Sequence, residues 1–208
     1  MSKQILVFGS TGRVGSSLVH QALEADHTVY AFARNPAKIA LQHPRLRVLE
    51  GDIYQPETVR QALERDLDAV LMTVGADPLK PSTVVGDSVR AILEGMRQTG
   101  HSRYLGVTGT AQMPATPFGR VTQFFIRRFI RAAEDHQHAF DEVVRSSVDY
   151  ALAACPYIKD GPLTGRYTQT TGPFPGGYKI ISPPNVAHFF VQELERGQYH
   201  RQTVGIWN

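Results

Sequence analysis

The chain has 208 residues, of which 42% are hydrophobic and 20% are charged, and this composition fits one globular domain with an ample core. It contains no run of about 18 apolar residues and no N-terminal signal-peptide pattern, so we expect a cytoplasmic protein without a membrane span. The single cysteine, Cys155, excludes an internal disulfide, and only 5 of the 22 basic residues are lysine, a balance that fits recognition of phosphate or carboxylate groups.

Short apolar runs alternate with segments of helical spacing. In chain order we predict strand 5–8, helix 14–25, strand 27–33, strand 46–49, a helix that begins near residue 56, strand 69–74, helix 84–97, strand 104–108, one or two helices over 118–147, and strand 150–154. Residues 156–177 are rich in Pro, Gly and Thr and predict a loop. A short strand at 178–181, a final helix capped by Asn185 and a last strand or tail over 203–207 follow. This alternation predicts an α/β fold with a Rossmann-type, doubly wound parallel sheet in a single domain, residues 1–208.

A glycine-rich segment, GSTGRVG, follows the first strand and opens the first helix. In open parallel sheets such a loop holds the pyrophosphate of a dinucleotide on backbone N–H groups and on the positive end of the helix dipole. The spacing GxxGxxG is the variant that short-chain dehydrogenases/reductases use. The alternative interpretation is a turn that happens to hold three glycines. We expect the first interpretation, with cofactor contacts from Gly9, Ser10, Thr11, Gly12, Arg13 and Val14.

The residue after the second strand indicates which dinucleotide binds. NAD-binding proteins usually place an acid about 20 residues past the last glycine, to hold the ribose 2′-hydroxyl. Arg34 stands there instead, and Glu50 is the only acidic residue between residues 27 and 50. A guanidinium would pair with the 2′-phosphate of NADP(H), and Arg13 and Lys38 are further candidates for it. The alternative is that Arg34 is merely a solvated residue at a strand end.

Further contacts are expected where the later strands end. Asp52 can accept from the adenine amino group with Ile53 beside the ring, or it can simply be a turn residue. Val74–Gly75 would let the backbone approach the adenosine ribose, and Val107–Thr108 should lie near the nicotinamide. We therefore expect NADP(H) as the cofactor.

Familiar catalytic patterns are missing from the sequence. No tyrosine has a lysine four residues later, so the Tyr-x-x-x-Lys pair of typical short-chain reductases is missing. No Ser/His/Asp group or metal-ligand cluster has convincing spacing, and His136 and His138 do not share a helix face. If the protein is an enzyme, an acceptor that needs little acid–base help during hydride transfer fits it best.

Five segments carry a resemblance to a known family: residues 8–15, 33–35, 51–53, 135–136 and 160–168, the last reading DGPLTGRYT. Together they resemble the atypical, NmrA-like short-chain dehydrogenases/reductases, in particular the NADPH-dependent reductases of flavins and linear tetrapyrroles, over nearly the whole chain. The resemblance implies an enzyme that stacks a flavin (FMN, FAD or riboflavin) or biliverdin over the nicotinamide.

The resemblance also implies roles for single residues. It places His136 near the nicotinamide ribose and Pro156 and Tyr157 beside the nicotinamide. Arg128 and Lys179 would meet carboxylates or phosphate of the substrate. From its place beside a loop, Phe118 could wall the substrate pocket, and we expect the substrate elements within 109–131 and 155–182.

The sequence departs from the family at two positions. Gly109 replaces the usual serine after the fifth strand, and Tyr157 stands where histidine is frequent. Thr110 is a possible substitute for the serine, so the candidate catalytic residues are Thr108, Thr110 and Tyr157. These departures weaken the prediction of flavin reduction less than the prediction of tetrapyrrole reduction. The rival hypotheses are a non-catalytic NADP(H) sensor that regulates a partner, and an isomerase or dehydratase of the extended reductases.

The segment Gln123–Arg131 mixes phenylalanine with arginine. It can be a helix with Phe and Ile packed inward and solvated arginines, a helix that binds a membrane surface or nucleic acid, or a lid. We expect the first. Accordingly we expect a monomer whose partner is a small-molecule substrate, without nucleic-acid or membrane binding.

Overall fold

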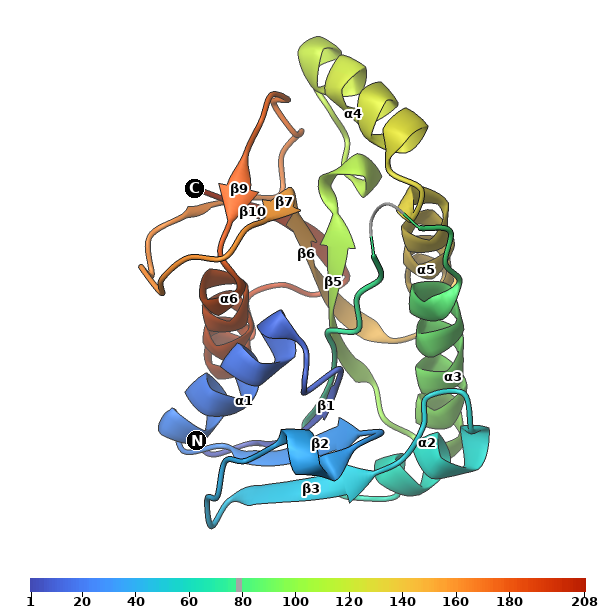
Figure 1. Ribbon diagram of the computed structural model, residues 1–208, viewed down its shortest axis with the longest axis vertical. Coiled ribbons are helices and arrows are strands. Elements are labelled where there is room, and N and C mark those ends of the chain that lie inside the picture. Colours follow the sequence, from blue (N-terminus) through green and yellow to red (C-terminus); the bar gives the residue numbers. More distant parts are fainter. Residues whose placement is uncertain (78–79) are drawn as a thin grey trace.

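An eight-stranded sheet runs through the protein in the computed structural model, which describes residues 1–77 and 80–208 (Figure 1). The strand order is β3-β2-β1-β4-β5-β6-β10-β8. Neighbouring strands are parallel except for β8, which is antiparallel to β10. The strands are β1 Gln4–Phe8, β2 Thr28–Ala33, β3 Leu46–Glu50, β4 Ala69–Met72, β5 Arg103–Gly109, β6 Asp149–Cys155, β8 Thr168–Thr170 and β10 Gln202–Trp207. The predicted doubly wound, Rossmann-type sheet is confirmed.

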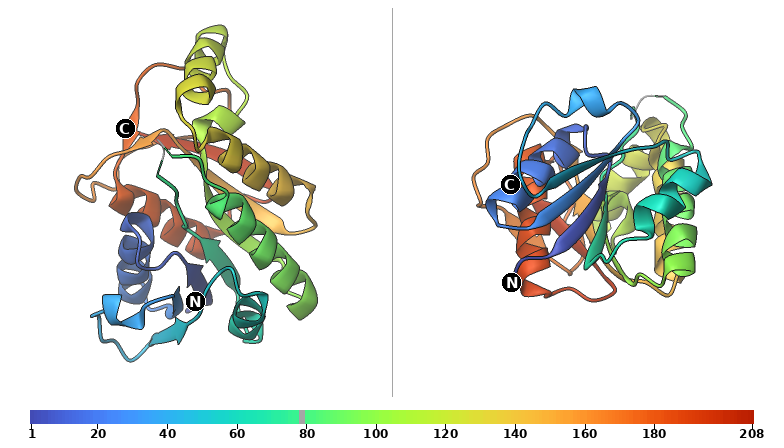
Figure 2. Two further views of the ribbon diagram at one scale, coloured as in Figure 1. Left: turned by 45° about the vertical axis from the view of Figure 1, so that its right-hand side comes forward. Right: turned by 90° about the horizontal axis from the view of Figure 1, so that it is seen from below.

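Helices cover both faces of this sheet. Helices α1 (Arg13–Glu24) and α6 (Pro183–Arg196) pack together on one face. Helices α2 (Pro56–Leu63), α3 (Val84–Thr99) and α5 (Ala133–Arg145) cover the other. Two single 3-10 turns, η1 (Pro36–Lys38) and η2 (Thr110–Gln112), follow β2 and β5. Helix α4 (Pro117–Phe129) projects past the sheet at one end of the molecule (Figures 1 and 2).

Strand β1 shows why the fold needs both helical layers. All four side chains of Ile5–Phe8 are inaccessible to solvent. Because successive side chains point to opposite faces, Ile5 and Val7 pack under α1 and α6 while Leu6 and Phe8 pack under α2 and α3. Burial of each such side chain contributes about 1.5–3 kcal/mol to stability.

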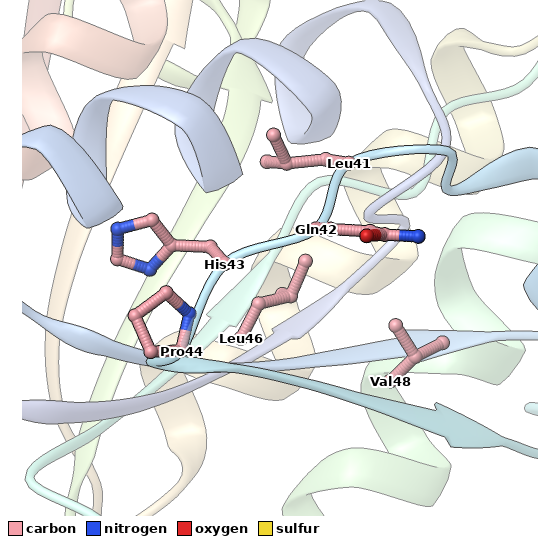
Figure 3. A pocket seen from close by; sticks show the side chains of 6 residues that line it. All are labelled: Leu41, Gln42, His43, Pro44, Leu46 and Val48. Atoms are coloured by element: carbon pink, nitrogen blue, oxygen red, sulfur yellow. The ribbon is translucent and has the colours of Figure 1, made fainter.

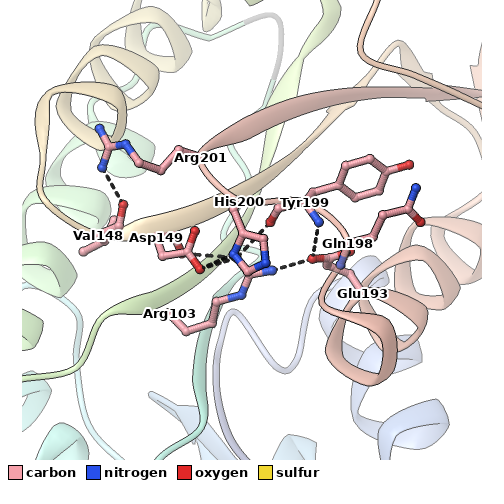
Figure 4. A network of polar contacts seen from close by, with 8 residues as sticks. All are labelled: Arg103, Val148, Asp149, Glu193, Gln198, Tyr199, His200 and Arg201. Atoms are coloured by element: carbon pink, nitrogen blue, oxygen red, sulfur yellow. Dashed lines mark hydrogen bonds and ion pairs between the residues drawn. The ribbon is translucent and has the colours of Figure 1, made fainter.

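A polar network fastens the amino ends of the central strands, at the edge of the sheet opposite the glycine loop (Figure 4). Arg103, the first residue of β5, donates to Asp149 Oδ2 at 3.0 Å and to Glu193 Oε1 of α6 at 2.5 Å. His200 Nδ1 lies 2.8 Å from the same Asp149 oxygen. The buried Glu193 also accepts the backbone N–H of Tyr199 at 2.9 Å. The network therefore joins β5, β6, α6 and the turn that leads into β10.

The region after β6 differs from the sequence prediction. Residues 156–177 are not all loop, because β7 (Tyr157–Ile158) pairs with β9 (Ile180–Ile181) and β8 pairs with β10. These strands have two or three residues, too few for a detectable repeat. Asn185 is also not the cap of α6: Ser182 occupies that position and accepts the N–H of Asn185 at 3.3 Å.

Asn185 has a different task, inside the first turn of α6. Its buried Oδ1 accepts the N–H of Thr164 at 2.9 Å and the N–H of Gly165 at 3.1 Å, while Ser182 Oγ donates to Pro162 O at 2.8 Å. The distinctive PLTG segment is therefore held in place by the start of α6.

Helix α4 contradicts the expectation that its aromatic residues pack inward. Phe124, Phe125 and Phe129 are 64%, 52% and 65% exposed, and the buried residues of the helix are Gly119 and Gln123. The helix extends past the sheet, where no core is available to receive the rings. In the described part of the chain, no helix is long and apolar enough to cross a membrane.

Candidate functional site

The carboxyl ends of the parallel strands meet at one edge of the sheet, and the sequence-predicted cofactor residues lie in the loops that leave it. The glycine loop follows β1, Arg34 follows β2, Asp52 follows β3, Val74 follows β4 and Pro156 follows β6. In open α/β sheets this edge is where ligands bind. The fold therefore brings together segments that are up to about 150 residues apart in the sequence.

The loop after β1 has the geometry expected of a nucleotide-binding turn. Gly9 adopts a φ of +80°, and its carbonyl accepts the N–H of Gly12 at 2.9 Å. A Cβ on Gly15 would lie 2.1 Å from Gly9 O and 2.7 Å from Thr73 Oγ1. Only glycine fits at both positions, because one needs a left-handed backbone and the other a close approach of helix to strand.

The N-terminus of α1 behind this turn is suited to an anion. No side chain caps the helix, and its first turn contains no acidic residue. The first N–H groups of a helix have no partner within the helix, and the dipole adds positive charge there. Ser10 turns its hydroxyl inward, donating to Phe32 O at 2.8 Å, so it would offer a ligand its backbone N–H only. These features fit the pyrophosphate of a dinucleotide.

The basic residues at this edge are arranged differently from one another. Arg34 is exposed directly after β2, and Lys38 is exposed in η1. Arg13 instead donates to Asp160 Oδ1 at 2.9 Å and to Ile158 O at 3.3 Å, across the edge toward the loop after β7. Both partners of this ion pair are largely exposed, so it contributes little to stability and can give way to a ligand. The sequence offered no sign of the pairing between Arg13 and Asp160.

The proposed adenosine contacts are partly engaged by the protein itself. Asp52 Oδ1 accepts the N–H of Tyr54 at 3.1 Å, as in an Asx turn, which is the structural role left open for this residue. Ile53 is buried in the hydrophobic core together with the inward-facing residues of α2. A Cβ added at Gly75 would meet no heavy atom of the described residues within 4 Å, so none of them fills the space there. Contact of Asp52, Ile53 and Val74 with adenosine stays a prediction.

The candidate catalytic residues divide into two kinds. Thr108 and Thr110 are 4% and 2% exposed, so neither hydroxyl is open to a substrate in this structure. Thr108 Oγ1 is also without a hydrogen-bond partner among the described residues. Tyr157 is 57% exposed, and its ring centroid lies 6.4 Å from that of Tyr178. A flat ligand at this end of the site would meet tyrosine rings before it met a threonine hydroxyl, and catalysis by either threonine stays a prediction.

Asp135 has a role that the sequence analysis did not find. This buried carboxylate of α5 accepts the N–H of Val85 at 3.1 Å and the N–H of Gly86 at 2.7 Å, which belong to the first turn of α3. It therefore caps α3 from another helix and fixes where the loop after β4 ends. The partners are about 50 residues apart, so no local spacing could have revealed the contact.

His136 follows Asp135 and is half-buried near the start of α5. Burial lowers the pKa of His136, although the charge of Asp135 opposes the shift. The imidazole is therefore neutral at neutral pH and can both donate and accept a hydrogen bond. Its predicted contact with the nicotinamide ribose is untested.

The predicted substrate residues lie on separate segments. Phe118 is 64% exposed at the start of α4. Arg128 lies over the ring of Phe129, 5.7 Å from its centroid, and Lys179 Nζ lies 6.0 Å from the centroid of the Trp207 ring. The structure gives no direct contact between these residues, so a common substrate site for them also stays a prediction.

Cys155 is buried at the end of β6, and burial raises the pKa of its thiol. Within residues 1–77 and 80–208, no group of three or more His, Cys, Asp and Glu side chains could hold a metal ion.

A hollow of about 530 Å³ lies beside the edge strand β3 (Figure 3). Its lining is mostly apolar and comes from the loop before β3 and from β3 itself: Leu41, Gln42, His43, Pro44, Leu46 and Val48. Leu46 is the first residue of β3, so the hollow is near the amino end of that strand and not at the glycine loop. It lacks the convergent polar groups expected of a small-molecule site.

Comparisons with known proteins identify the family of this chain and relatives of its fold. The sequence profile of the NAD(P)H-binding family matches residues 9–196. Curated proteins that are 33–39% identical to parts of this chain are longer, and the chain covers 21–23% of their length.

Three solved structures have the same fold. A candidate NADH-flavin reductase from Streptococcus pneumoniae has a TM-score of 0.82 at 20% identity, with 100% of both chains covered. ChuY, an anaerobilin reductase from Escherichia coli, has a TM-score of 0.76 at 20% identity, with 98% of this chain and 96% of that chain covered. A short-chain dehydrogenase/reductase of the wide type from Veillonella parvula, solved with NADP, has a TM-score of 0.77 at 17% identity, with 100% and 95% covered.

Proposed function

Because this chain belongs to the NAD(P)H-binding family, we propose that it is an NADPH-dependent reductase that transfers hydride to a flavin or to another flat conjugated acceptor such as biliverdin. The observation that carries this proposal is the uncapped N-terminus of α1 behind the glycine turn, with Arg34 exposed at the end of the neighbouring strand. This arrangement suits a dinucleotide that carries an additional phosphate.

The preference for NADPH over NADH rests on charge. A carboxylate after β2 would repel a 2′-phosphate, whereas the guanidinium of Arg34 can donate to it. Arg13 can contribute once it leaves Asp160. The Veillonella parvula structure, which contains NADP, supports this choice of cofactor.

Catalysis would come from positioning. When bound, NADPH supplies the hydride, and the protein holds the acceptor flat against the nicotinamide. Tyr157 and Tyr178 offer exposed rings on which the acceptor can stack. The hydroxyls of Thr108 and Thr110 are enclosed and cannot donate a proton to the acceptor, so water would supply the proton that the reduced acceptor takes up. This suits a flavin, whose reduction asks little acid–base help of the protein.

The more specific proposal is an activity like that of biliverdin reductase B, the NADPH-dependent flavin reductase that the PLTG segment resembles. The names of the Streptococcus pneumoniae and Escherichia coli proteins, a flavin reductase and a bilin reductase, support this class of acceptor. Gly109 and Tyr157 depart from the family pattern and favour flavin over tetrapyrrole.

A second candidate function is a non-catalytic NADP(H) sensor. The observation that favours it is that Thr108 and Thr110 are enclosed, which leaves neither threonine hydroxyl open to an acceptor. Such a protein would bind NADPH and signal to a partner without consuming it.

One experiment separates these functions. Calorimetry measures NADPH binding, and absorbance then follows NADPH oxidation with FMN, FAD, riboflavin or biliverdin as acceptor. Oxidation that depends on an acceptor supports the reductase, while tight binding without oxidation by any acceptor supports the sensor. Absence of NADPH binding would overturn both.

Two tyrosines of similar exposure supply a matched pair of variants for the same assay. Tyr157 and Tyr54 are 57% and 53% exposed, but Tyr54 follows β3. We expect Tyr157→Ala to lower kcat/KM for the flavin about tenfold, the size of a lost aromatic stacking contact. Tyr54→Ala should leave that ratio unchanged.

A further inference from the structure

Helix α4 presents a continuous apolar stripe to solvent. Phe118, Val121, Phe125 and Phe129 are 64%, 52%, 52% and 65% exposed. Their spacing of three, four and four residues places them along one side of a helix. The rings of Phe125 and Phe129 are parallel within 7°, with centroids 6.1 Å apart. A contiguous exposed patch of this kind marks an interaction surface.

The opposite side of α4 is fastened to the protein, so the stripe cannot turn inward without breaking contacts. Gln123 Nε2 donates to Thr110 O at 2.8 Å and to Met113 O at 2.9 Å. Arg127 Nη2 donates to Ala111 O at 2.7 Å. These bonds fix the rotation of the helix about its axis and direct the stripe outward.

The charge around the stripe identifies its partner. Arg128 is exposed beside it and Arg131 is exposed just past the end of the helix, and the chain has no acidic residue between Glu94 and Glu134. A symmetric contact between two copies of α4 would bring arginines against arginines without any carboxylate on the helix to neutralise them. An anionic lipid surface satisfies both features, since rings enter the boundary of head groups and acyl chains while guanidinium groups reach the phosphates.

We propose that α4 docks this protein on an anionic membrane surface. The helix lies in the plane of the interface, with Phe118, Val121, Phe125 and Phe129 inserted and the flanking arginines on lipid phosphates. The helix lies at one end of the molecule (Figures 1 and 2), and the four stripe residues are each more than half exposed. This inference replaces the expectation of a protein without membrane binding and the expected substrate roles of Phe118 and Arg128. It does not depend on the proposed reductase activity, whose argument uses neither residue.

Cosedimentation of the full-length protein with vesicles tests the proposal. One set of vesicles contains equal parts of phosphatidylglycerol and phosphatidylcholine, and the other contains phosphatidylcholine alone. We expect the protein to sediment with the anionic vesicles at least about tenfold more strongly than with the neutral ones, and high salt should reduce the difference.

Two double variants examine the two components of the surface. Phe125→Ser with Phe129→Ser should lower binding to anionic vesicles about tenfold or more, because two rings no longer enter the interface. Arg128→Glu with Arg131→Glu should lower it by about twenty-five-fold or more, at about fivefold for each lost cation. All four positions are exposed, so the thermal unfolding midpoint should stay that of the wild type.

Matched controls lie on other elements. Tyr54→Ser removes an exposed aromatic residue after β3, and Arg90→Glu with Arg145→Glu makes the same change of charge on α3 and α5. Both controls should bind anionic vesicles as the wild type does.

Four results would overturn the proposal. The wild type could stay in the supernatant with both kinds of vesicle, or the controls could lose binding as much as the α4 variants. If the phenylalanine double variant bound anionic vesicles as strongly as the wild type, nonspecific attraction of charge would explain the binding and the apolar stripe would have no part in it. A wild-type dimer in sedimentation velocity that the phenylalanine variant converts to a monomer would assign the stripe to a second copy of the chain.

Discussion

At the scale of single residues, Arg34 decides which dinucleotide the site accepts. It is exposed immediately after β2, at the strand end where NAD-binding proteins place an acid. We expect Arg34→Glu to weaken NADPH binding at least about tenfold, because a charge-assisted hydrogen bond is replaced by repulsion. Binding of NADH should change little or improve, since a carboxylate can accept from the 2′-hydroxyl. Calorimetric titration of both cofactors measures the two affinities.

Arg47→Glu is the matched control for this change. Arg47 is also exposed and lies on the neighbouring strand β3, but near its amino end, where it donates to Pro44 O. The same change of charge there should leave both affinities close to those of the wild type. Equal losses of NADPH and NADH binding in Arg34→Glu would show that Arg34 supports the fold of the loop and does not contact the 2′-phosphate.

At the scale of secondary-structure elements, the contact between α5 and α3 is the one on which the site depends most directly. Asp135 accepts two N–H groups from the first turn of α3, and α3 begins after the loop that carries Val74 and Gly75. Asp135→Asn removes the charge and turns an NH₂ group toward one of those donors. We expect a loss of about 1–3 kcal/mol in the free energy of unfolding, measured by urea denaturation, together with weaker NADPH binding.

Asp87→Asn separates hydrogen bonding from charge at the same helix end. Asp87 lies in the first turn of α3, but its side chain is partly exposed and pairs with Arg90 at 3.3 Å. Its replacement should cost less than about 1 kcal/mol, as for other exposed ion pairs. If the two variants lost equal stability, the negative charge near α3 would matter and the two hydrogen bonds of Asp135 would not.

The elements also show how far the sequence predicts this structure. Strands β1, β2, β4, β5 and β6 are recognisable because each is a mostly buried and largely apolar run, and Gly100 ends α3 with a φ of +81°. The sequence analysis places the N-cap of α6 at Asn185, three residues after the observed cap, Ser182. A serine directly before a proline, as in Ser182–Pro183, is itself a signal for the start of a helix. In α4 the repeat of aromatic residues correctly indicates that one side of the helix is apolar. Such a repeat does not determine whether that side packs against the core or faces solvent.

At the scale of the whole molecule, the alternation of strands and helices was sufficient to predict the sheet and the edge at which the candidate site lies. The glycine loop and Arg34 were found because they depend only on their distance from a strand end. Contacts such as Arg13 with Asp160, or Asp135 with Gly86, join segments far apart in the sequence. Their existence depends on packing between elements, which a single sequence does not record.

Stability of the whole molecule should depend on pH through its buried histidines. His27 is 1% exposed; its Nδ1 accepts the N–H of Lys3 at 3.1 Å, and its Nε2 has no hydrogen-bond partner among the described residues. Burial lowers the pKa of His27 below its ordinary 6.5, and burial also lowers the pKa of His136 and of His188. Between the lowered pKa and 6.5 the unfolded chain binds more protons than the folded one, so stability falls as the pH drops through this window.

We therefore expect the free energy of unfolding, measured with urea, to decrease from about pH 7 to about pH 5. Asp149 acts in a more acidic range, because its pKa, which burial would raise, is held below 3.8 by His200 and Arg103. His27→Asn keeps an acceptor for the N–H of Lys3 but cannot be protonated, so its stability should decline less steeply over the same range. His20→Asn, which changes an exposed histidine of α1, is the control. If His27→Asn declined as steeply as the wild type, the acid sensitivity would have to come from His136, His188 or the carboxylates, and the buried imidazole near the N-terminus would not be its source.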